Sequence, residues 1–499
     1  MPSIPSPYAY ELEVCTFVNN EGEGFDIRKL VLGIKLHEGI TQNFLLGEIV
    51  IQDATGFLEN GKLFGQESLR LKFRQPQGEG LSDIHPDEII DQVFRIYQIG
   101  GIGRIGQSTS SITLRFSSPE FIDAQRIRIS QAYRGSMSDI AGKIAKDHLD
   151  ITIDQATAQE APKLVPYFQV REKSQDDAFH VVIPNWTISK SLNWLLSNAQ
   201  GVDSQSGLQD SYFFYQTANG GYNIQSLESM MSTDYLNGET FHYAPAAASR
   251  QKSVNSPWDE EPAEESDSIG LGRRIMGYKI NKSANVLEGL VSGMFASKQI
   301  TVDNTYKFYH ERSYDYLERF YSGSEMSMNP YPIIRQQQER VHIGEAAGEE
   351  GDVVVSPDKE YKRLTHYSDV YTMLSSDSHS VYDKDNKVTQ ASHNAHEGAD
   401  QYRVAAKQLL KYYTMDISLP TRTDISVGQT IDLNIPLTKP GDGSADGLEA
   451  KFHSGKHLIT DITWEIGPGG CYTTATVIKD SIINQIESTI TEIVDPIEA

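Results

Sequence analysis

The stretch Leu69-Arg70-Leu71-Lys72-Phe73-Arg74 alternates strictly between apolar and charged residues. A repeat of two residues is typical of a β-strand with one face buried and the other in solvent. The same alternation returns in residues 10–14 and 112–116, and Asn60-Gly61 has the chemistry of a two-residue hairpin turn. We therefore expect residues 1–120 to form a barrel or sandwich of antiparallel strands.

The hydrophobic period changes after Pro119 from two residues to that of a helix. Ser136 is placed to cap a helix, and Asp139 follows three residues later, as in a capping box. A second helix is expected over residues 188–199, where apolar residues recur at helical spacing. These patterns predict a mixed α/β domain over residues 121–270. Its end, residues 256–268, holds two prolines, six acids and no base, and is expected to be a solvated linker.

Strand patterns return in the second half of the chain and predict a second β barrel. Residues 271–310 and 410–480 supply its strands, and the segment 430–435 alternates as clearly as any in the first domain. Between these two parts, residues 311–409 are polar and Tyr-rich and are expected to form an inserted β-rich module that ends in a helix. The overall prediction is an α+β fold dominated by β-structure, with two barrels that bracket the chain.

Residues 481–499 are expected to form an amphipathic tail. Isoleucines recur there at nearly helical spacing, with acidic residues between them, which favours a helix that docks on a partner. A frayed terminus is the alternative. The isoleucines are Ile482, Ile486, Ile490, Ile493 and Ile497.

Composition excludes several classes of protein. The chain has 499 residues with 44 Lys and Arg against 68 Asp and Glu, so its net charge of -24 disfavours binding to phosphate backbones and anionic lipids. The two cysteines, Cys15 and Cys471, are too few and too far apart for a disulfide framework or a thiolate metal cluster. We expect a soluble protein without a signal peptide or membrane span.

The string Gly101-Ile102-Gly103-Arg104-Ile105-Gly106 matches the glycine spacing of a dinucleotide-binding turn. That turn must lead into a helix whose N-terminus faces the pyrophosphate. Here the glycines lead into the alternating residues 112–116. We therefore expect a glycine-rich hairpin and no cofactor.

Two histidine pairs are candidates for metal ligands, and neither has the spacing of a known metal site. His393 and His396 lack the spacing of a metalloprotease motif, and His453 and His457 lack a third ligand nearby, so exposed loop histidines are the expected reading. Residues 442–447 resemble half of a calcium loop, but the twelfth position is His453 in place of the required Glu. The sequence predicts no catalytic residue, no cofactor-binding residue and no metal ligand, and it leaves the partner-binding residues unknown.

Five segments, taken in order, resemble the baseplate hub protein of contractile-tailed bacteriophages of the T-even type. They are residues 42–53, 59–73, 287–303, 415–420 and 424–433, and they match strand, hairpin and strand patterns of that family. The resemblance spans nearly the whole chain. It rests on structural patterns and on no catalytic motif.

The resemblance implies a structural virion protein of the tail baseplate, made in the host cytoplasm, that acts as a homotrimer. In such a hub, two tail-tube-like barrels per subunit give a pseudo-sixfold ring, which joins the hexameric tail tube to the trimeric spike within the baseplate wedges. The expected partners are therefore other copies of the chain, the tube protein, the spike or tail-lysozyme protein and the wedge proteins. Genomic DNA would pass through the ring without specific binding, and we hypothesise that acidic residues line the channel.

Two alternatives stay open at the level of sequence. One is a hub component of a type VI secretion-like or other contractile injection system, although no short repeats that could build a needle follow residue 480. The other is a tail-associated cell-wall hydrolase that uses a carboxylate pair, which the sequence does not single out among its 68 acids.

Overall fold

The computed structural model describes residues 8–484 in part. It leaves out residues 55, 58–62, 76–88, 105–108, 152–167, 171–178, 200–210, 220, 244–273, 284, 304–307, 323–326, 334–339, 343–359, 363–371, 377–379, 383–387, 392–398 and 437–449. The Asn60-Gly61 turn, the acidic linker and the tail beyond Asn484 therefore lie outside the described residues.

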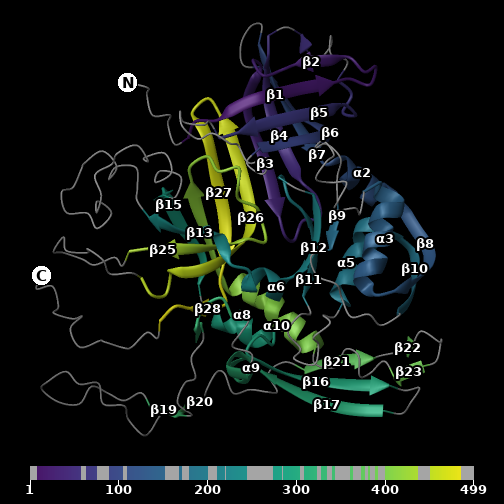
Figure 1. Cartoon of the computed structure of the whole chain (residues 1–499), viewed down its shortest axis with the longest axis vertical. Coiled ribbons are helices and arrows are strands. Elements are labelled where there is room, and N and C mark those ends of the chain that lie inside the picture. The colour runs from purple at the N-terminus through teal and green to yellow at the C-terminus, as the bar shows by residue number, and fades with distance from the viewer. Residues whose placement is uncertain are drawn as a thin grey trace, which may run out of the picture.

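The first β module is an antiparallel sheet built from the alternating segments (Figure 1). Leu69, Leu71 and Phe73 are fully buried, whereas the charged residues between them stay partly exposed, as the alternation predicts. Its strand order is β3-β4-β7-β6-β5-β1-β2. The strands are β1 (Glu11–Val18), β2 (Gly24–Asp26), β3 (Val31–Gly39), β4 (Leu46–Asp53), β5 (Ser68–Arg74), β6 (Ile89–Arg104) and β7 (Ser110–Ser117).

The second β module gathers strands from three distant parts of the sequence. β13 (Tyr235–Tyr243) precedes the acidic linker and pairs with β25 (Thr430–Asn434), while β14 (Arg274–Ile275) and β15 (Gly277–Ser283) follow the linker. β24 (Tyr413–Leu419), β26 (Gly455–Gly467) and β27 (Gly470–Ile478) complete the module.

The two modules form one continuous sheet. β26 pairs with β3, so fourteen of the described strands belong to a single hydrogen-bonded sheet (Figure 1). The described strands do not form two separate barrels, because β26 of the second module also pairs with β3 of the first. One buried hydrophobic cluster runs through both modules, from Cys15 and Phe17 to Trp464 and Val477.

The α/β domain packs beside the first module. Ser136 caps α3 (Met137–Leu149) by accepting from the Asp139 amide, and Thr187 caps α5 (Ile188–Ser197), so both helices form where their patterns predict them. These helices cover the antiparallel pair of β8 (Arg128–Gly135) and β10 (Phe179–Thr187). The remaining elements are α2 (Pro119–Arg126), β9 (Phe168–Val170), β11 (Tyr212–Gln216), β12 (Tyr222–Ser226) and α6 (Leu227–Ser232).

The inserted module lies at the opposite end of the molecule from β1 and β2 (Figure 1). β16 (Ala296–Asp303), β17 (Phe308–Asp315) and β21 (Thr372–Ser376) form their own sheet, whereas β14 and β15 lie in the large one. The other elements are α8 (Val286–Val291), α9 (Tyr316–Ser322), β18 (Tyr331–Pro332), β19 (Arg340–His342), β20 (Glu360–Lys362), β22 (Ser380–Tyr382), β23 (Val388–Ala391), α10 (Ala399–Tyr412) and β28 (Ser481–Ile482). Within the residues described, no helix is long and apolar enough to cross a membrane.

Candidate functional site

The antiparallel pairing of β3 with β26, called the seam below, joins the two β modules into one continuous sheet. The pairing runs from Asp461 opposite Gly39 to Ile466 opposite Ile34, without a break in register. β26 can make this contact because its first residues pair with β25 and its later ones extend along β3. One face of the sheet therefore crosses both modules as a single pleated surface.

A row of alternating charges crosses this face from strand to strand. Lys35 lies opposite Glu465 on one side and opposite Glu48 on the other, and Arg115 lies opposite Glu48 on the next strand. Lys35 Nζ is 2.7 Å from Glu465 Oε1, and Arg115 Nε is 3.3 Å from Glu48 Oε2. Opposite charges at directly facing positions stabilise a sheet modestly, and here they leave the row without net charge.

A shallow hollow of about 230 Å³ lies beside this row, at the seam. Glycines make much of its floor, because Gly33, Gly467 and Gly470 place no side chain on the surface there. Tyr472, which is 45% exposed, lies at its edge, and its ring is tilted by 40° against the ring of Tyr8 at a centroid distance of 4.6 Å. The face therefore combines paired charges with a smooth depression.

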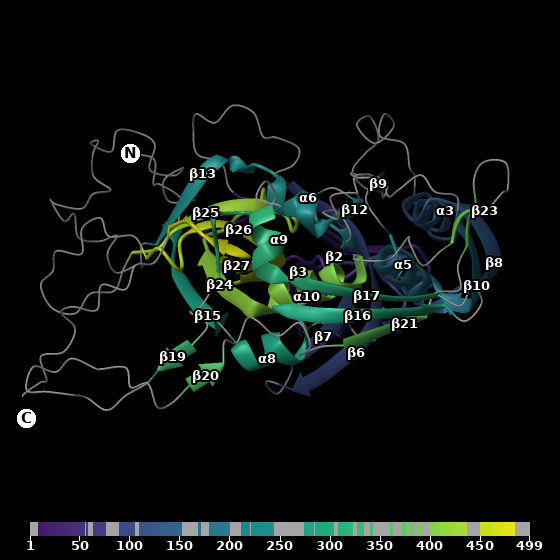
Figure 2. The ribbon, with the colours of Figure 1, turned by 90° about the horizontal axis from the view of Figure 1, so that it is seen from below.

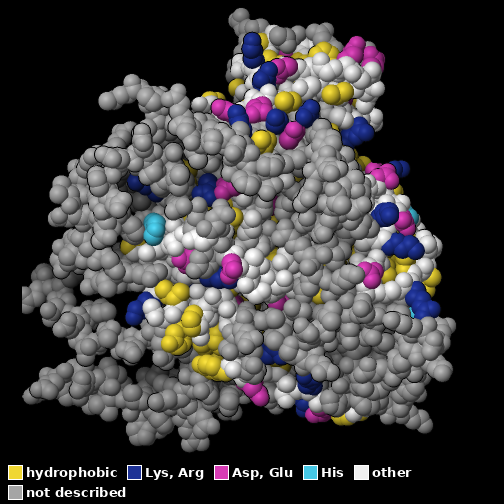
Figure 3. Space-filling view, in the orientation of Figure 1, with side chains coloured by type: hydrophobic (Ala, Val, Ile, Leu, Met, Phe, Trp, Pro, Cys, Tyr) yellow, Lys and Arg dark blue, Asp and Glu magenta, His cyan; other side chains and the backbone are white. Residues whose placement is uncertain are grey.

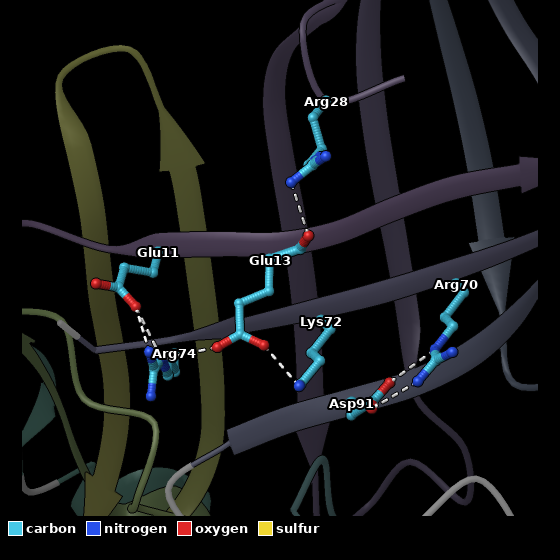
Figure 4. A network of polar contacts seen from close by, with 7 residues as sticks. All are labelled: Glu11, Glu13, Arg28, Arg70, Lys72, Arg74 and Asp91. Atoms are coloured by element: carbon cyan, nitrogen blue, oxygen red, sulfur yellow. Dashed lines mark hydrogen bonds and ion pairs between the residues drawn. The ribbon is translucent and has the colours of Figure 1, made fainter. Parts of the chain in front are cut away.

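Charges on the neighbouring face of the first module are also paired among themselves. Figure 4 shows Arg74 between Glu11 and Glu13, with Lys72 bound to Glu13 at 2.5 Å. Arg70 forms two hydrogen bonds to Asp91, from β5 to β6. The space-filling view shows the same mixture, with basic and acidic side chains interspersed over this module (Figure 3).

Glu38 lies beneath the seam and joins three parts of the chain. Its side chain is fully buried, and its two carboxylate oxygens accept from the amides of Ala218 and Val427, each at 2.7 Å. These amides belong to the α/β domain and to the second module. Burial raises the pKa of Glu38 to about 8, although the two N–H donors favour its ionised form.

A cluster of basic and aromatic side chains lies at the other end of the second module. Lys479 is fully buried over the rings of Tyr413 and Phe452, and its amine donates to the Phe452 carbonyl. Burial lowers the pKa of Lys479 to about 7. His453 Nδ1 lies 2.9 Å from the Tyr413 hydroxyl, and His457 bonds the Gly455 carbonyl through Nδ1.

The expected exposure of this histidine pair is wrong, since His453 is only partly exposed to solvent and His457 is buried. The side chain of His457 has no exposed surface, and burial together with nearby Lys479 holds its pKa well below the usual range. The reason is that residues 455–467 form a strand of the shared sheet, not a loop. No group of three or more potential metal ligands occurs among the described residues.

The other motifs fall as follows. The glycine string lies on β6, which leads into β7, so the prediction of a hairpin in place of a nucleotide turn is confirmed for the part of it that the structure describes. His393, His396 and the loop at residues 442–447 lie outside the described residues. Cys15 and Cys471 are both free and buried.

Glu38 was missed by sequence reasoning, although a signal for it exists. Ile34, Leu36 and Glu38 occupy alternate positions of β3, and all three are buried. A charged residue at a core-facing position of a strand is the informative exception to the alternation. The partners of Glu38, which lie 180 and 389 residues away, carry no such signal.

Comparison with known proteins finds likeness only among solved structures. No protein-family model and no curated protein matches the sequence. The tail protein from Neisseria meningitidis MC58 is 10% identical, with a TM-score of 0.46 over 95% of this chain and 97% of that one. The 43 kDa tail protein of prophage MuSo2 from Shewanella oneidensis is 9% identical, with a TM-score of 0.47 over 94% and 99%.

A third solved structure is the E. coli c3393 protein. It is described as a component of the type VI secretion system with structural similarity to the T4 bacteriophage tail proteins gp27 and gp5. It is 9% identical, with a TM-score of 0.36 over 95% of this chain and 77% of that one. Likeness at this level assigns neither a family nor a function to the chain.

Proposed function

We propose that this chain is a structural subunit of a contractile tail, at the baseplate hub. In this role three copies form a ring that joins the hexameric tail tube to the trimeric spike, with baseplate wedge proteins around it. The observation that carries the proposal is the β3–β26 seam, because it makes each subunit contribute two β modules to one unbroken wall.

The pairing inside the second module supports a barrel-like unit. β14 and β15 are separated by Met276 alone, whose amide donates to the Ser418 carbonyl at 2.8 Å. β13 pairs with β14, and the chain continues through Met276 into β15. Strand pairs then lead from β15 to β24, β27, β26 and β25, and back to β13. We propose that the two modules are the tube-like units of the hub.

Passage of DNA is part of the same proposal. The charge row on the seam face holds two acids and two bases, so it adds no net charge to a wall that it lines. Acidic residues elsewhere on the chain would then repel the phosphates and let the duplex slide. Purified protein is expected to leave duplex DNA unshifted in a gel at physiological salt, and a stable shifted complex would contradict this part.

The ring itself is tested by electron microscopy of the purified protein. We expect particles with threefold symmetry and a central channel, and class averages that contain single subunits only would contradict the hub. Coexpression with a tube protein and a spike protein of the same system would then identify the two faces of the ring.

We also propose that the chain has no catalytic activity. The alternative of a tail-associated hydrolase makes a direct prediction, which is clearing of peptidoglycan in a zymogram run with the purified protein. We expect no clearing, and a cleared band at the mass of this chain would overturn the proposal.

A further inference from the structure

A partly open cavity of about 70 Å³ lies where three helices meet: α6, α9 and α10. This volume is several times the ~10–15 Å³ that a single water molecule needs. The cavity volume is similar to the volume of one branched aliphatic side chain. Its apolar walls are Leu227, Met231, Tyr314, Tyr316, Phe320, Tyr402, Ala405, Ala406 and Leu409.

The acidic groups in these walls are already bound within the chain. Glu228 accepts from the Ser211 amide and hydrogen-bonds the Tyr402 hydroxyl. Asp480 accepts from the Met328 amide at 3.2 Å. A guest in the cavity therefore meets mainly aromatic and aliphatic surface, which favours an apolar side chain over a polar one.

Apolar surface continues outside the cavity along α9. Tyr321 is 66% exposed and lies edge-on to Phe320 at a ring distance of 5.8 Å. Arg319 sits beside them with its guanidinium over the Tyr402 ring at 4.9 Å. The site thus has an apolar pocket, an exposed aromatic neighbour and one basic group.

The isoleucine-rich residues 482–497 closely follow Asp480, which lines the cavity. Asp480 lines the cavity, and the next two residues form β28, which pairs with β18 through Ile482 opposite Tyr331. The described chain reaches Asn484, so the fifteen residues 485–499 begin within a short extended segment of the cavity.

The chemistry of residues 485–499 matches this site. Ile486, Ile490 and Ile493 recur at helical spacing, so a helix places them on one face. The residues between them include Glu487 and Glu492, and no Lys or Arg follows Lys479. An apolar helix face suits the aromatic and aliphatic walls of this cavity.

We propose that residues 485–494 of this chain dock as a helix on α6, α9 and α10 and insert an isoleucine side chain into the cavity. The helix ends before Pro496, which has no amide hydrogen to continue it. Docking covers Tyr321 and ties the end of the second module to the inserted module. This proposal is independent of the proposed hub function, since it concerns a contact within one subunit.

Cysteine crosslinking in the full chain tests the contact. Ala405→Cys is combined in turn with Ile486→Cys, Ile490→Cys and Ile493→Cys, and the two native cysteines are fully buried. We expect at least one pair to form a disulfide under mild oxidation within a single chain. The control pair Ala405→Cys with Ser488→Cys, which lies on the opposite helix face, is expected to form several-fold less.

The mass of the crosslinked product distinguishes a segment of the same chain in the cavity from a segment of a second copy. A crosslinked product of twice the chain mass would assign the cavity to a second copy and overturn the proposal, as would equal crosslinking of the Ser488 control. Hydrogen exchange gives a second readout that needs no change in the cavity. Amides of residues 486–493 are expected to exchange ~tenfold faster after Ile486→Ser and Ile490→Ser, and unchanged rates would overturn the docking.

Discussion

Glu38 accepts hydrogen bonds from two segments of the chain that are remote from it in sequence, and it has no cation beside it among its described contacts. Glu38→Ala would leave the amides of Ala218 and Val427 buried without an acceptor. We expect it to lower the free energy of unfolding by about 3 kcal/mol, measured by denaturant titration. Glu38→Gln keeps an acceptor and the side-chain volume, and is expected to cost less than Glu38→Ala.

The same residue makes stability depend on pH in a defined direction. Its pKa is raised from 4.5 to about 8 in the fold, so the folded carboxyl keeps a proton that the unfolded one has released within this window. The free energy of unfolding should therefore fall as pH rises from 6 to 8, by about 1 kcal/mol per pH unit relative to Glu38→Gln. Parallel pH curves for the two proteins would contradict this assignment.

Lys479 predicts the opposite trend at higher pH. Burial lowers its pKa from 10.5 to about 7, so between these values the unfolded chain holds a proton that the folded chain lacks. Stability should therefore rise with pH between 8 and 10 in the wild type and much less in Lys479→Met. Lys451→Met, at an exposed position of the preceding loop, is the matched control and should retain the wild-type rise.

Glu38 and His457 show which contacts of single residues could not be predicted from the sequence. The break in the alternation at Glu38 is visible in the sequence, but its partners are brought together only by the tertiary fold. His457 reads as a loop residue because Gly455 and Lys456 precede it, and the pairing of β26 with β25 is what buries it. A local sequence pattern predicts which face of a strand is buried, but it does not predict which other strands or loops the strand will contact.

At the scale of elements, strand β4 packs tightly enough to exclude a methyl group. A Cβ at Gly47 would lie 2.3 Å from the Phe116 ring and 2.7 Å from the Lys35 carbonyl, whereas nothing lies within 4 Å of one at Gly101. Gly47→Ala should therefore lower the free energy of unfolding by about 2 kcal/mol or more. Gly101→Ala on β6 should change it by less than about 0.5 kcal/mol, and equal effects of the two would contradict the packing.

Helices and strands that form because of neighbouring residues could be predicted from the sequence. Elements whose place depends on pairing with a distant segment could not. α3 follows from Ser136 and its apolar stripe, and β7 follows from alternation alone. The place of β13 in the second module does not, because its partner β25 lies almost two hundred residues away. α6, capped by Ser226, is too short for its period to stand out.

At the scale of the whole molecule, the two modules share one sheet and one hydrophobic cluster, while the inserted module and the α/β domain lie beside them (Figures 1 and 2). Alternation in the sequence predicted β-structure near both ends of the chain. It assigned β16 to the second module and β13 to the α/β domain, whereas β16 lies in the sheet of the inserted module and β13 lies in the large sheet. It did not predict the seam, because no local pattern specifies that β3 meets β26. Through this seam, each chain contributes two β modules to one sheet.

The central claim is that three copies of this chain form the ring. Light scattering on the purified full chain at micromolar concentration tests it most directly. A particle of three times 55.7 kDa is the predicted result. A strict monomer of 55.7 kDa at the same concentration would contradict the claim.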